Sequence, residues 1–396
     1  MDKDRLLSLL DNFAIEVPSW GFADTGTRFG KFLQDAAAVD LSDKLEDAGQ
    51  CHALTGCCPT VAMHVLWDFT KGQNPAEVSA LAEKFGVKIG SINANLFQDQ
   101  CYKYGSFGNP DPAVRERALE HVVDCVELSR DLKSPITTLW FADGTNYPGQ
   151  DSMRSRKRRF EETLKKAYKK LDKEQQFLIE YKPFEPAFYQ TDIGDWGMSY
   201  IFCKKLGPKA KVLVDTGHHF QSQNIEQIVA WLLDEQMLGG FHFNDRRYAD
   251  DDLTLGSIDP YQIFRIFHEI HSYAADLGAY PPIAYMIDQS HNLKPKVEAM
   301  VQTAVTAQEL YLKAAMVDRD ELLAAQAKTD IVAAETILKN AFFADVSGVL
   351  KQWRKAKGLP VDPIAALRKS NYIARKGTER VAKRVSLGLV SGGGYA

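Results

Sequence analysis

Eight short apolar runs alternate with longer amphipathic stretches along the 396 residues of this chain. Each run has the length and character of a buried strand, and each is followed by residues whose apolar positions recur at helical spacing. The runs span residues 13–22, 61–69, 87–97, 136–144, 177–185, 211–219, 239–247 and 282–290. Eight strands that are each followed by a helix predict an α/β fold, namely a (β/α)8 TIM barrel.

The chain beyond the last of these runs carries helical patterns without another strand. Because no strand remains for this part to pair with, we expect it to lie outside the barrel, with its apolar faces packed on the barrel or on another subunit. The sequence therefore predicts a (β/α)8 barrel catalytic domain over residues 1–315 and a C-terminal α-helical extension over residues 316–396.

Charge and cysteine content narrow the class of protein. The formal net charge is −4, which gives no overall basic field to attract nucleic acid. The basic stretch 154–170 carries Glu161 and Glu162 at helical spacing, so we expect it to be a solvated helix face. No CxxC pair, charged-then-apolar leader or apolar run near the ~18 residues of a membrane span is present. These features predict a soluble, reduced, cytoplasmic protein with no nucleic-acid or membrane partner.

Polar side chains interrupt the predicted strands near their carboxyl ends, where the active sites of such barrels lie. Singly, an aspartate there is more often a helix cap, a histidine a packed core residue, and a Glu-x-Lys pair a plain ion pair. Four consecutive strands that end in acids and histidines are much less expected by chance. In chain order, the polar residues at strand ends are His64, Asp68, Asp143, Glu180, Lys182, Asp215, His218, His242, Asp245, Asp288 and His291.

The acids at these strand ends need positive partners. Crowding about five carboxylates at one barrel mouth without cations would raise their pKa values or destabilise the fold. Two divalent cations and the ammonium of Lys182 would balance the charge. Carboxylates mixed with imidazoles suit Mn²⁺, Mg²⁺ or Co²⁺ better than structural zinc. The acids concerned are Glu180, Asp215, Asp250, Asp252 and Asp288.

Three adjacent aspartates, Asp250, Asp251 and Asp252, follow the seventh predicted strand. Alternate side chains of an extended loop face the same way, so Asp250 and Asp252 can reach one cation. Asp251, between them, is expected to point to solvent. The run is therefore predicted to supply two metal ligands.

Three tryptophans, Trp20, Trp67 and Trp140, lie on or next to predicted strands and would wall this polar floor. A sugar fits such a site because its hydroxyls chelate metals and bond carboxylates while its C–H faces stack on indole rings. No GxGxxG or GxxxxGK(S/T) motif stands between a strand and a helix, so no nucleotide cofactor is expected. The predicted partner is a small-molecule sugar.

Several segments resemble the L-rhamnose isomerases of the Pseudomonas type, within the wider group of xylose-isomerase-like barrels. The strongest are IEYKPFEP (179–186), VLVDTGHH (212–219), FHFNDRRYADDD (241–252) with GSIDPYQ (256–262), and MIDQSHNLKPKVE (286–298). HVLWDF (64–69) and WFADGTNYPGQ (140–150) also fit, so the resemblance spans most of residues 13–300. It implies a homotetrameric aldose–ketose isomerase with two divalent cations per subunit, Mn²⁺ first, with Mg²⁺, Co²⁺ or Zn²⁺ as alternatives.

The resemblance also implies two sets of metal ligands. The first cation would be held by Glu180, Asp215, His242 and Asp288. The second would be held by His218, Asp250 and Asp252, with Asp215 as the bridge between the two cations.

The remaining implied roles concern the substrate. Lys182, Asp288 and His64 would be catalytic: Lys182 contacts a substrate oxygen, and His64 assists ring opening. Trp20, Trp67 and Trp140 would line the sugar pocket together with His64 and Lys182, and Phe29 would reach into the pocket of a neighbouring subunit. Hydrogen would then move between C1 and C2, either as a hydride or as a proton through an enediol, and the residues do not distinguish these routes.

The leading prediction is interconversion of L-rhamnose and L-rhamnulose, with D-allose and D-psicose and other aldoses as further substrates. A sugar 3-epimerase on a similar barrel would use one metal and two opposed glutamates. A metal-dependent endonuclease would need a basic surface, which the net charge of −4 does not supply. A sugar-binding or scaffold protein would leave the metal site without purpose.

Overall fold

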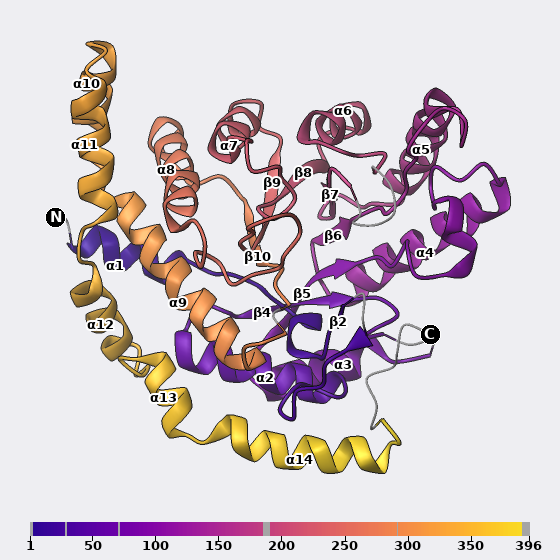
Figure 1. The fold of residues 1–396 in the computed structure, drawn as a ribbon, viewed down its shortest axis with the longest axis horizontal. Coiled ribbons are helices and arrows are strands. Elements are labelled where there is room, and N and C mark those ends of the chain that lie inside the picture. The colour runs from indigo at the N-terminus through magenta and orange to yellow at the C-terminus, as the bar shows by residue number, and fades with distance from the viewer. Residues whose placement is uncertain (1–2, 28–29, 70–71, 185–190, 291, 390–396) are drawn as a thin grey trace.

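A computed structural model describes residues 3–27, 30–69, 72–184, 191–290 and 292–389. Within these ranges, eight parallel strands pair in chain order to form one sheet that curves into a barrel, with helices around its outside (Figure 1). The fold is the predicted TIM barrel. Its strands are β1 (Val17–Pro18), β4 (Thr60–His64), β5 (Lys88–Asn93), β6 (Ile136–Leu139), β7 (Gln176–Glu180), β8 (Ala210–Asp215), β9 (Leu238–Phe243) and β10 (Ala284–Ile287).

The barrel closes between its first and last strands through the residue before β1. The backbone N–H of Glu16 donates to the carbonyl of Tyr285 at 2.8 Å, and the N–H of Ile287 donates to the carbonyl of Glu16 at 2.9 Å. Apolar side chains fill the interior below the mouth, where Leu178, Leu213 and Met286 pack together. The barrel is therefore a packed core that leaves room for chemistry only at its ends.

Every predicted strand overlaps an observed strand. Each prediction, however, continues beyond the carboxyl end of the observed strand. The run 211–219, for example, forms a strand only as far as Asp215. There Asp215 Oδ1 accepts a hydrogen bond from the N–H of Gly217 at 2.6 Å, and the chain turns. The polar residues that interrupted the predicted strands thus lie at strand ends and in the loops that follow them.

A helix follows each strand of the described barrel. Three of these helices begin where Asn74, Asp111 or Asp259 caps a first-turn amide and a proline takes the next position, which is a favourable helix start. The helices are α2 (Leu41–Thr55), α3 (Pro75–Lys84), α4 (Pro112–Asp131), α5 (Met153–Tyr168), α6 (Trp196–Leu206), α7 (Ile225–Asp234), α8 (Pro260–Leu277) and α9 (Lys296–Ala315).

Short elements accompany the first and third strands. The helix α1 (Lys3–Asn12) precedes β1, was not predicted, and contacts α9 and α12. The connection from β1 to α2 contains a 3-10 turn, η1 (Trp20–Phe22), and a small hairpin, β2 (Gly26–Thr27) and β3 (Gly30–Lys31). Another 3-10 turn, η2 (Gln100–Tyr104), lies between β5 and α4.

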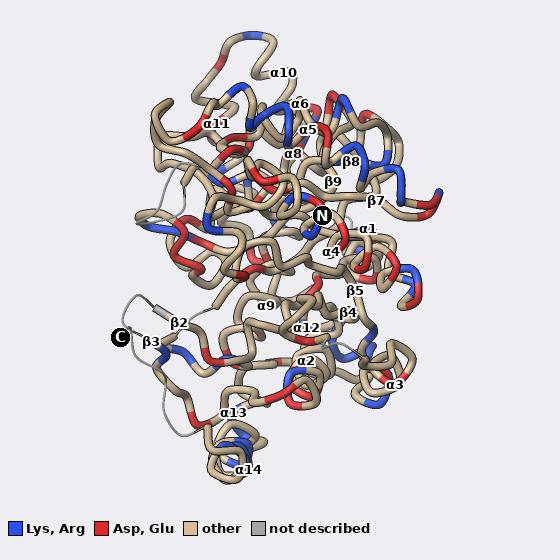
Figure 2. The backbone as a smooth tube through the Cα atoms, turned by 90° about the vertical axis from the view of Figure 1, so that its right-hand side faces the viewer, with Lys and Arg blue, Asp and Glu red and all other residues tan. Residues whose placement is uncertain are grey.

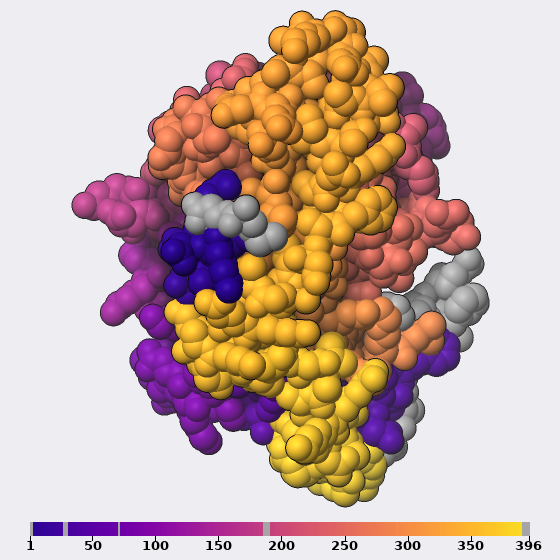
Figure 3. Space-filling model, turned by 90° about the vertical axis from the view of Figure 1, so that its left-hand side faces the viewer, coloured from indigo at the N-terminus to yellow at the C-terminus, as the bar shows by residue number. Residues whose placement is uncertain are grey.

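The chain beyond α9 is helical and lies outside the barrel, as predicted. Its helices are α10 (Arg319–Ala327), α11 (Ile331–Phe342), α12 (Ser347–Ala356), α13 (Pro363–Lys369) and α14 (Tyr372–Ser386). They run along one side of the molecule, with α10 and α11 at one end and α14 at the other (Figures 1 and 3). Although α9 ends at Ala315, the division into two domains at residues 315 and 316 stays a prediction.

Acidic and basic residues are interspersed along the outer helices (Figure 2). Most of the basic stretch 154–170 lies in α5, where Lys157 and Lys165 pair with Glu161 on an exposed face. Arg156 departs from the expected solvated face, because it is only 2% exposed and its Nη2 lies 2.8 Å from Asp192 Oδ2. None of the helices in the described ranges is long and apolar enough to cross a membrane.

Candidate active site

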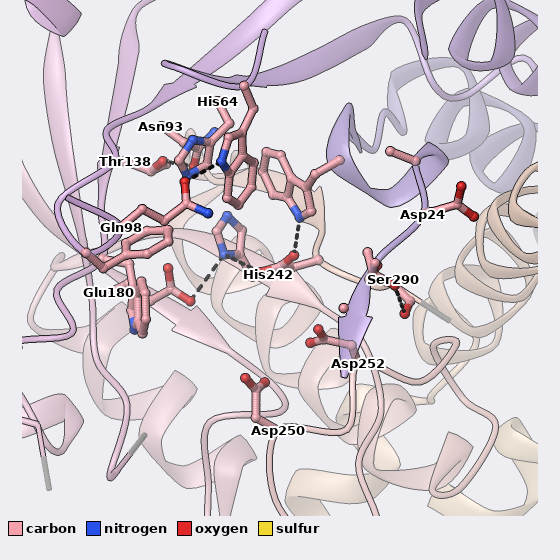
Figure 4. A pocket seen from close by; sticks show the side chains of 18 of the residues that line it. Asp24, His64, Asn93, Gln98, Thr138, Glu180, His242, Asp250, Asp252 and Ser290 are labelled. Atoms are coloured by element: carbon pink, nitrogen blue, oxygen red, sulfur yellow. Dashed lines mark hydrogen bonds and ion pairs between the residues drawn. The ribbon is translucent and has the colours of Figure 1, made fainter. Parts of the chain in front are cut away.

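A pocket of about 770 Å³ opens at the carboxyl ends of the barrel strands. Side chains from β4, β5, β6, β7 and β9, and from the loops after β1, β8, β9 and β10, line it (Figure 4). It contains acids, histidines and indole rings together. The pocket therefore lies where the polar strand ends predicted a site.

Three residues that line this pocket form a compact group with one fully buried neighbour, Asp215. Glu180 ends β7, Asp215 ends β8, His242 lies in β9, and Asp288 directly follows β10. Each contributes one potential ligand atom, and these atoms all lie within 4.8 Å of one another. Adjacent parallel strands bring their carboxyl ends to the same edge, which explains how residues far apart in the sequence meet here. The set is the one implied for the first cation.

His242 stands among the carboxylates of this group. Its Nδ1 lies 3.3 Å from Glu180 Oε1, 3.6 Å from Asp288 Oδ2 and 3.9 Å from Asp215 Oδ2. Although burial alone would lower it, these acids raise the pKa of the His242 imidazole to about 9. In the same group, burial raises the pKa of the Asp215 carboxyl to about 7. The group therefore carries concentrated negative charge in a buried place, which a cation would stabilise.

One oxygen of Asp215 fits a metal-ligand role. Asp215 Oδ2 is buried and has no hydrogen-bond donor among the described residues. It lies 3.9 Å from His242 Nδ1 on one side and 3.9 Å from His218 Nε2 on the other. A buried carboxylate oxygen without a donor is costly unless a cation satisfies it. Its position between two histidines from different predicted ligand sets fits the predicted bridge.

The second predicted set gathers around the same edge of the pocket. His218 Nε2 lies 3.2 Å from Asp250 Oδ1, and both residues line the pocket with Asp252. Burial beside Asp250, Asp288 and Asp215 raises the pKa of the Asp252 carboxyl well above its ordinary value. Its side chain is half-buried in the pocket, and the residues present fit a second cation.

Lys182 makes direct contact with this second set. Its Nζ lies 2.7 Å from Asp250 Oδ2 and 5.1 Å from the centre of the Trp140 ring. The ammonium therefore sits between the predicted ligands and the aromatic wall. It is 6% exposed, so its charge acts in a largely water-free place.

Trp20, Trp67 and Trp140 all line the pocket, and two of them also make polar contacts. Trp20 Nε1 donates a hydrogen bond to Asp288 Oδ1 at 2.9 Å, and Trp67 Nε1 donates to Gln98 Oε1 at 2.6 Å. Trp140 packs edge-on against Phe97, with ring centres 4.9 Å apart. The wall is thus part of the polar network as well as an apolar surface.

His64 lies flat against one of these rings. Its imidazole stacks on Trp67 with ring centres 3.7 Å apart and an interplanar angle of 19°. Nδ1 lies 3.1 Å from the carbonyl of Val65, and burial lowers the pKa of the imidazole to about 4. His64 is therefore neutral near pH 7, with Nε2 directed away from this backbone contact.

Several polar residues of the site were missed by sequence reasoning. Asn244 Nδ2 donates to Asp215 Oδ1 at 3.0 Å and to the carbonyl of Asp288 at 2.9 Å, so it connects two predicted ligands. Its place two residues after His242 was a signal that could have identified it. Asn93 and Thr138 line the opposite side of the pocket and share a short hydrogen bond, but they resemble ordinary strand residues in the sequence.

Two aspartates of the loop after β9 hold the loop itself. Asp245 Oδ2 accepts hydrogen bonds from the N–H groups of Ile258 and Asp259 at 2.7 and 3.0 Å. Asp251 was expected to point to solvent, but it is half-buried, and its Oδ2 accepts from the N–H groups of Arg247 and Tyr248. That expectation was wrong because the loop turns at this point instead of staying extended. Phe29 and His291 lie outside the described residues.

Known proteins resemble this chain in sequence and fold. The family model described as xylose isomerase-like TIM barrel matches residues 60–274. A probable sugar isomerase of Mesorhizobium japonicum is 38% identical over 385 residues, which cover 96% of this chain and 89% of that protein. Another, from Rhizobium meliloti, is 38% identical over 403 residues, covering 100% and 91%. The fold of a D-allulose 3-epimerase from Methylomonas sp. is similar, with a TM-score of 0.53 at 13% identity over 74% of this chain and 95% of that one.

These matches include the part of the chain that carries the site. The family region runs from β4 to α8 and contains Glu180, Asp215 and His242 of the compact group. The two probable sugar isomerases extend the similarity over the loop after β10 and the C-terminal helices, because they cover almost the whole chain. The chain belongs to the family of xylose isomerase-like TIM barrels.

Proposed function

We propose that this protein is a metal-dependent aldose–ketose isomerase that holds two divalent cations per subunit. The leading reaction is the interconversion of L-rhamnose and L-rhamnulose, and D-allose (with D-psicose) and other aldoses are further substrates. The cation is Mn²⁺ first, with Mg²⁺, Co²⁺ or Zn²⁺ as alternatives.

One observation carries this proposal: the compact group of Glu180, Asp215, His242 and Asp288, of which all but the buried Asp215 line a pocket that tryptophans also line. The set is three carboxylates and an imidazole, which suits a catalytic divalent cation better than a structural one. The donor-free Asp215 Oδ2, between His242 and His218, supports a second cation beside the first. Such cations, when bound, act as Lewis acids on two neighbouring oxygens of the sugar.

Lys182 is proposed to hold one of these sugar oxygens. Its ammonium lies at the pocket surface, 2.7 Å from Asp250 Oδ2, within a water-poor environment. There a fixed positive charge stabilises negative charge that develops on a carbonyl oxygen during hydrogen transfer. Asp250 keeps the ammonium in place.

His64 is proposed to assist ring opening. Opening a cyclic aldose requires a proton to leave the anomeric hydroxyl and a proton to reach the ring oxygen. A neutral imidazole can accept the first proton, and burial keeps the pKa of His64 near 4, so the ring is uncharged near pH 7. Its stacking on Trp67 holds it at the side of the pocket.

A 3-epimerase is the closest rival on this fold. Inverting a carbon requires one group to remove a proton from one face and a second group to return a proton to the other face. Glu180 is the single glutamate among the described residues that line the pocket. The described lining residues therefore include no second glutamate that could oppose Glu180, and this favours the isomerase.

The test is a panel of aldoses and ketoses assayed with the Mn²⁺-loaded protein and ranked by kcat/KM. We expect aldose–ketose conversion, with L-rhamnose first in rank. A protein that inverts C3 of ketoses and leaves aldoses untouched would contradict the proposal. With L-rhamnose labelled by deuterium at C2, label retained at C1 would favour the hydride route, whereas complete exchange with solvent would favour the enediol.

We further propose that the protein works as a homotetramer in the cytoplasm. The C-terminal helices leave apolar side chains exposed, among them Ile331, Val332 and Phe343, and contact with another subunit would cover such residues. The role of Phe29 in a neighbouring pocket belongs to this proposal. Light scattering of the purified protein tests it, and a monomer at micromolar concentration would contradict it.

A further inference from the structure

One wall of the pocket, here called the wall, is formed by residues 23–27 and 30–39 of the connection between β1 and α2. Asp24, Thr25, Gly26, Lys31 and Val39 of this connection line the cavity. In Figure 4, Asp24 lies on the other side of the pocket from Glu180. If cations at the candidate metal group bind one end of a sugar, the other end of that sugar would therefore lie next to this wall.

The wall is held from outside by α14, the last helix of the chain. Arg384 Nη2 lies 2.9 Å from Asp24 Oδ2 and donates to the carbonyl of Ala37 at 2.8 Å, while Nη1 donates to the carbonyl of Asp35 at 3.1 Å. Arg380 Nη1 donates to the carbonyl between them, that of Ala36, at 2.6 Å. Two arginines of one helix thus bind three successive carbonyls of the wall.

The contacts of Arg384 are partly or fully buried and use both terminal nitrogens of its guanidinium. Arg384 is 7% exposed, and its partner Asp24 is also bonded through Oδ1, which accepts from the N–H of Gln34 at 2.8 Å. A buried charge is tolerated only when it is paired and hydrogen-bonded, so removing either partner leaves the other uncompensated. The buried carbonyl of Ala37 would also lose a donor that water cannot readily replace.

The same wall is joined to the loop that carries Asp288. Thr25 Oγ1 donates to Asn292 Oδ1 at 2.5 Å, and Gln34 Nε2 donates to the carbonyl of Asn292 at 2.8 Å. Asn292 follows β10 a few residues after Asp288, and it also lines the pocket. A shift of the wall would consequently displace residues that face a sugar in the pocket.

Arg380 has a different main partner. Its Nη1 and Nη2 lie 2.8 and 2.9 Å from the two oxygens of Asp47, a residue of α2 that also accepts a hydrogen bond from Tyr372 Oη at 2.7 Å. This cluster ties α14 to the outer helix α2 rather than to the wall. Arg380 therefore binds mainly to α2, whereas the printed contacts of Arg384 are all with the wall.

We propose that Arg384 is a positioning residue for the sugar pocket. Through Asp24 and the carbonyls of Asp35 and Ala37, it keeps the wall in the conformation that receives the sugar. The proposal rests on the proposed isomerase function, and it assigns the C-terminal helix a role in substrate affinity. Neither hydrogen transfer nor metal binding should depend on Arg384, because its side chain lies outside the pocket.

The test uses the full-length Mn²⁺-loaded protein and the variants Arg384→Ala, Arg384→Lys and Arg375→Ala. Arg375 is the matched control, because it lies on the same helix in an exposed pair with Glu379. For Arg384→Ala we expect the KM of the best aldose to rise about tenfold, kcat to stay within about twofold, and Mn²⁺ affinity to be unchanged. Arg384→Lys should recover part of the loss, since an ammonium can pair with Asp24 but cannot bind all three acceptors.

Hydrogen exchange separates this proposal from the proposed function. Amides of residues 31–39 should exchange faster in Arg384→Ala than in Arg375→Ala, whether or not any sugar is turned over. Unchanged exchange in this segment would overturn the positioning role, and so would faster exchange with an unchanged KM. A wild-type protein that converts no aldose would contradict the isomerase proposal instead, while the exchange experiment would still decide whether Arg384 holds the wall.

Discussion

The indole Nε1 of Trp20 donates a hydrogen bond to Asp288 Oδ1 at 2.9 Å, which joins the aromatic wall to the candidate metal group. The other oxygen, Asp288 Oδ2, lies 3.6 Å from His242 Nδ1. Trp20 thus contributes a hydrogen bond as well as a ring to the pocket wall. It fixes the orientation of a carboxylate that is proposed both to bind a cation and to act in catalysis.

Replacing Trp20 by Phe keeps an aromatic ring and removes the N–H donor. We expect kcat/KM for the best aldose to fall about tenfold, because a hydrogen bond to a charged group contributes roughly 1.5–3 kcal/mol. Trp231→Phe is the matched control, since Trp231 is 57% exposed on an outer helix. Equal kcat/KM values for the two variants would show that the hydrogen bond from Trp20 to Asp288 does not contribute to catalysis.

Replacing Asp215 by Asn tests the proposed bridge between the cations. The change keeps the size of the side chain but removes the charge of the donor-free oxygen. We expect calorimetric titration with Mn²⁺ to show loss of tight binding at both sites, not at one alone. Asp234→Asn, an exposed aspartate at the end of α7, is the control. Retention of two tight sites in Asp215→Asn would contradict the bridging role.

Replacing Lys182 by Met separates substrate chemistry from metal binding. We expect kcat to fall roughly a hundredfold, because the fixed charge next to the sugar oxygen is lost. Mn²⁺ should bind at least as tightly as in the wild type, because Asp250 Oδ2 no longer pairs with an ammonium. A variant with wild-type kcat would remove Lys182 from the catalytic residues.

The stability of the fold should fall in mild acid, partly through His271, far from the pocket. Burial lowers the pKa of this imidazole to about 3, whereas an unfolded histidine titrates near pH 6.5. As pH falls below 6.5, the unfolded chain takes up a proton that the folded chain does not. Each such group therefore lowers the free energy of unfolding by about 1.4 kcal/mol per pH unit.

Denaturant titrations of metal-free protein at about pH 7 and about pH 5 check this expectation. His271→Gln should lose about 2 kcal/mol less than the wild type over this interval, because one depressed histidine is gone. Metal-free protein is used so that histidines proposed to bind cations add no metal-dependent effect. The same loss in both proteins would mean that His271 does not titrate as its burial implies.

Much of the barrel and of its mouth was predictable because both depend on local pattern. The strand ends Glu180, Asp215 and His242 could be brought together without a structure, since adjacent parallel strands end at one edge. The extent of each strand could not be predicted from apolar character alone. At Asp215 a side chain bonds to the following backbone and turns the chain, which apolar patterning does not reveal.

The remaining contacts depend on residues that are distant in the chain. Trp20 and Asp288 are 268 residues apart, and Arg384 and Asp24 are 360 apart. Nothing in the local sequence of α14 distinguishes the buried Arg384 from the exposed Arg375. The burial of Arg156 was equally hard to predict. It depends on the ion pair with Asp192, which is distant in the sequence, and not on the basic residues next to Arg156.

The most direct test of the proposed metal-dependent isomerase is turnover by protein that is stripped of metal with a chelator and then titrated with Mn²⁺. Bound Mn²⁺ per chain and isomerisation of the best aldose are measured on the same samples. We expect negligible turnover in the stripped protein and recovery of turnover in step with the binding of two Mn²⁺ per chain. Full turnover by the stripped protein would contradict it.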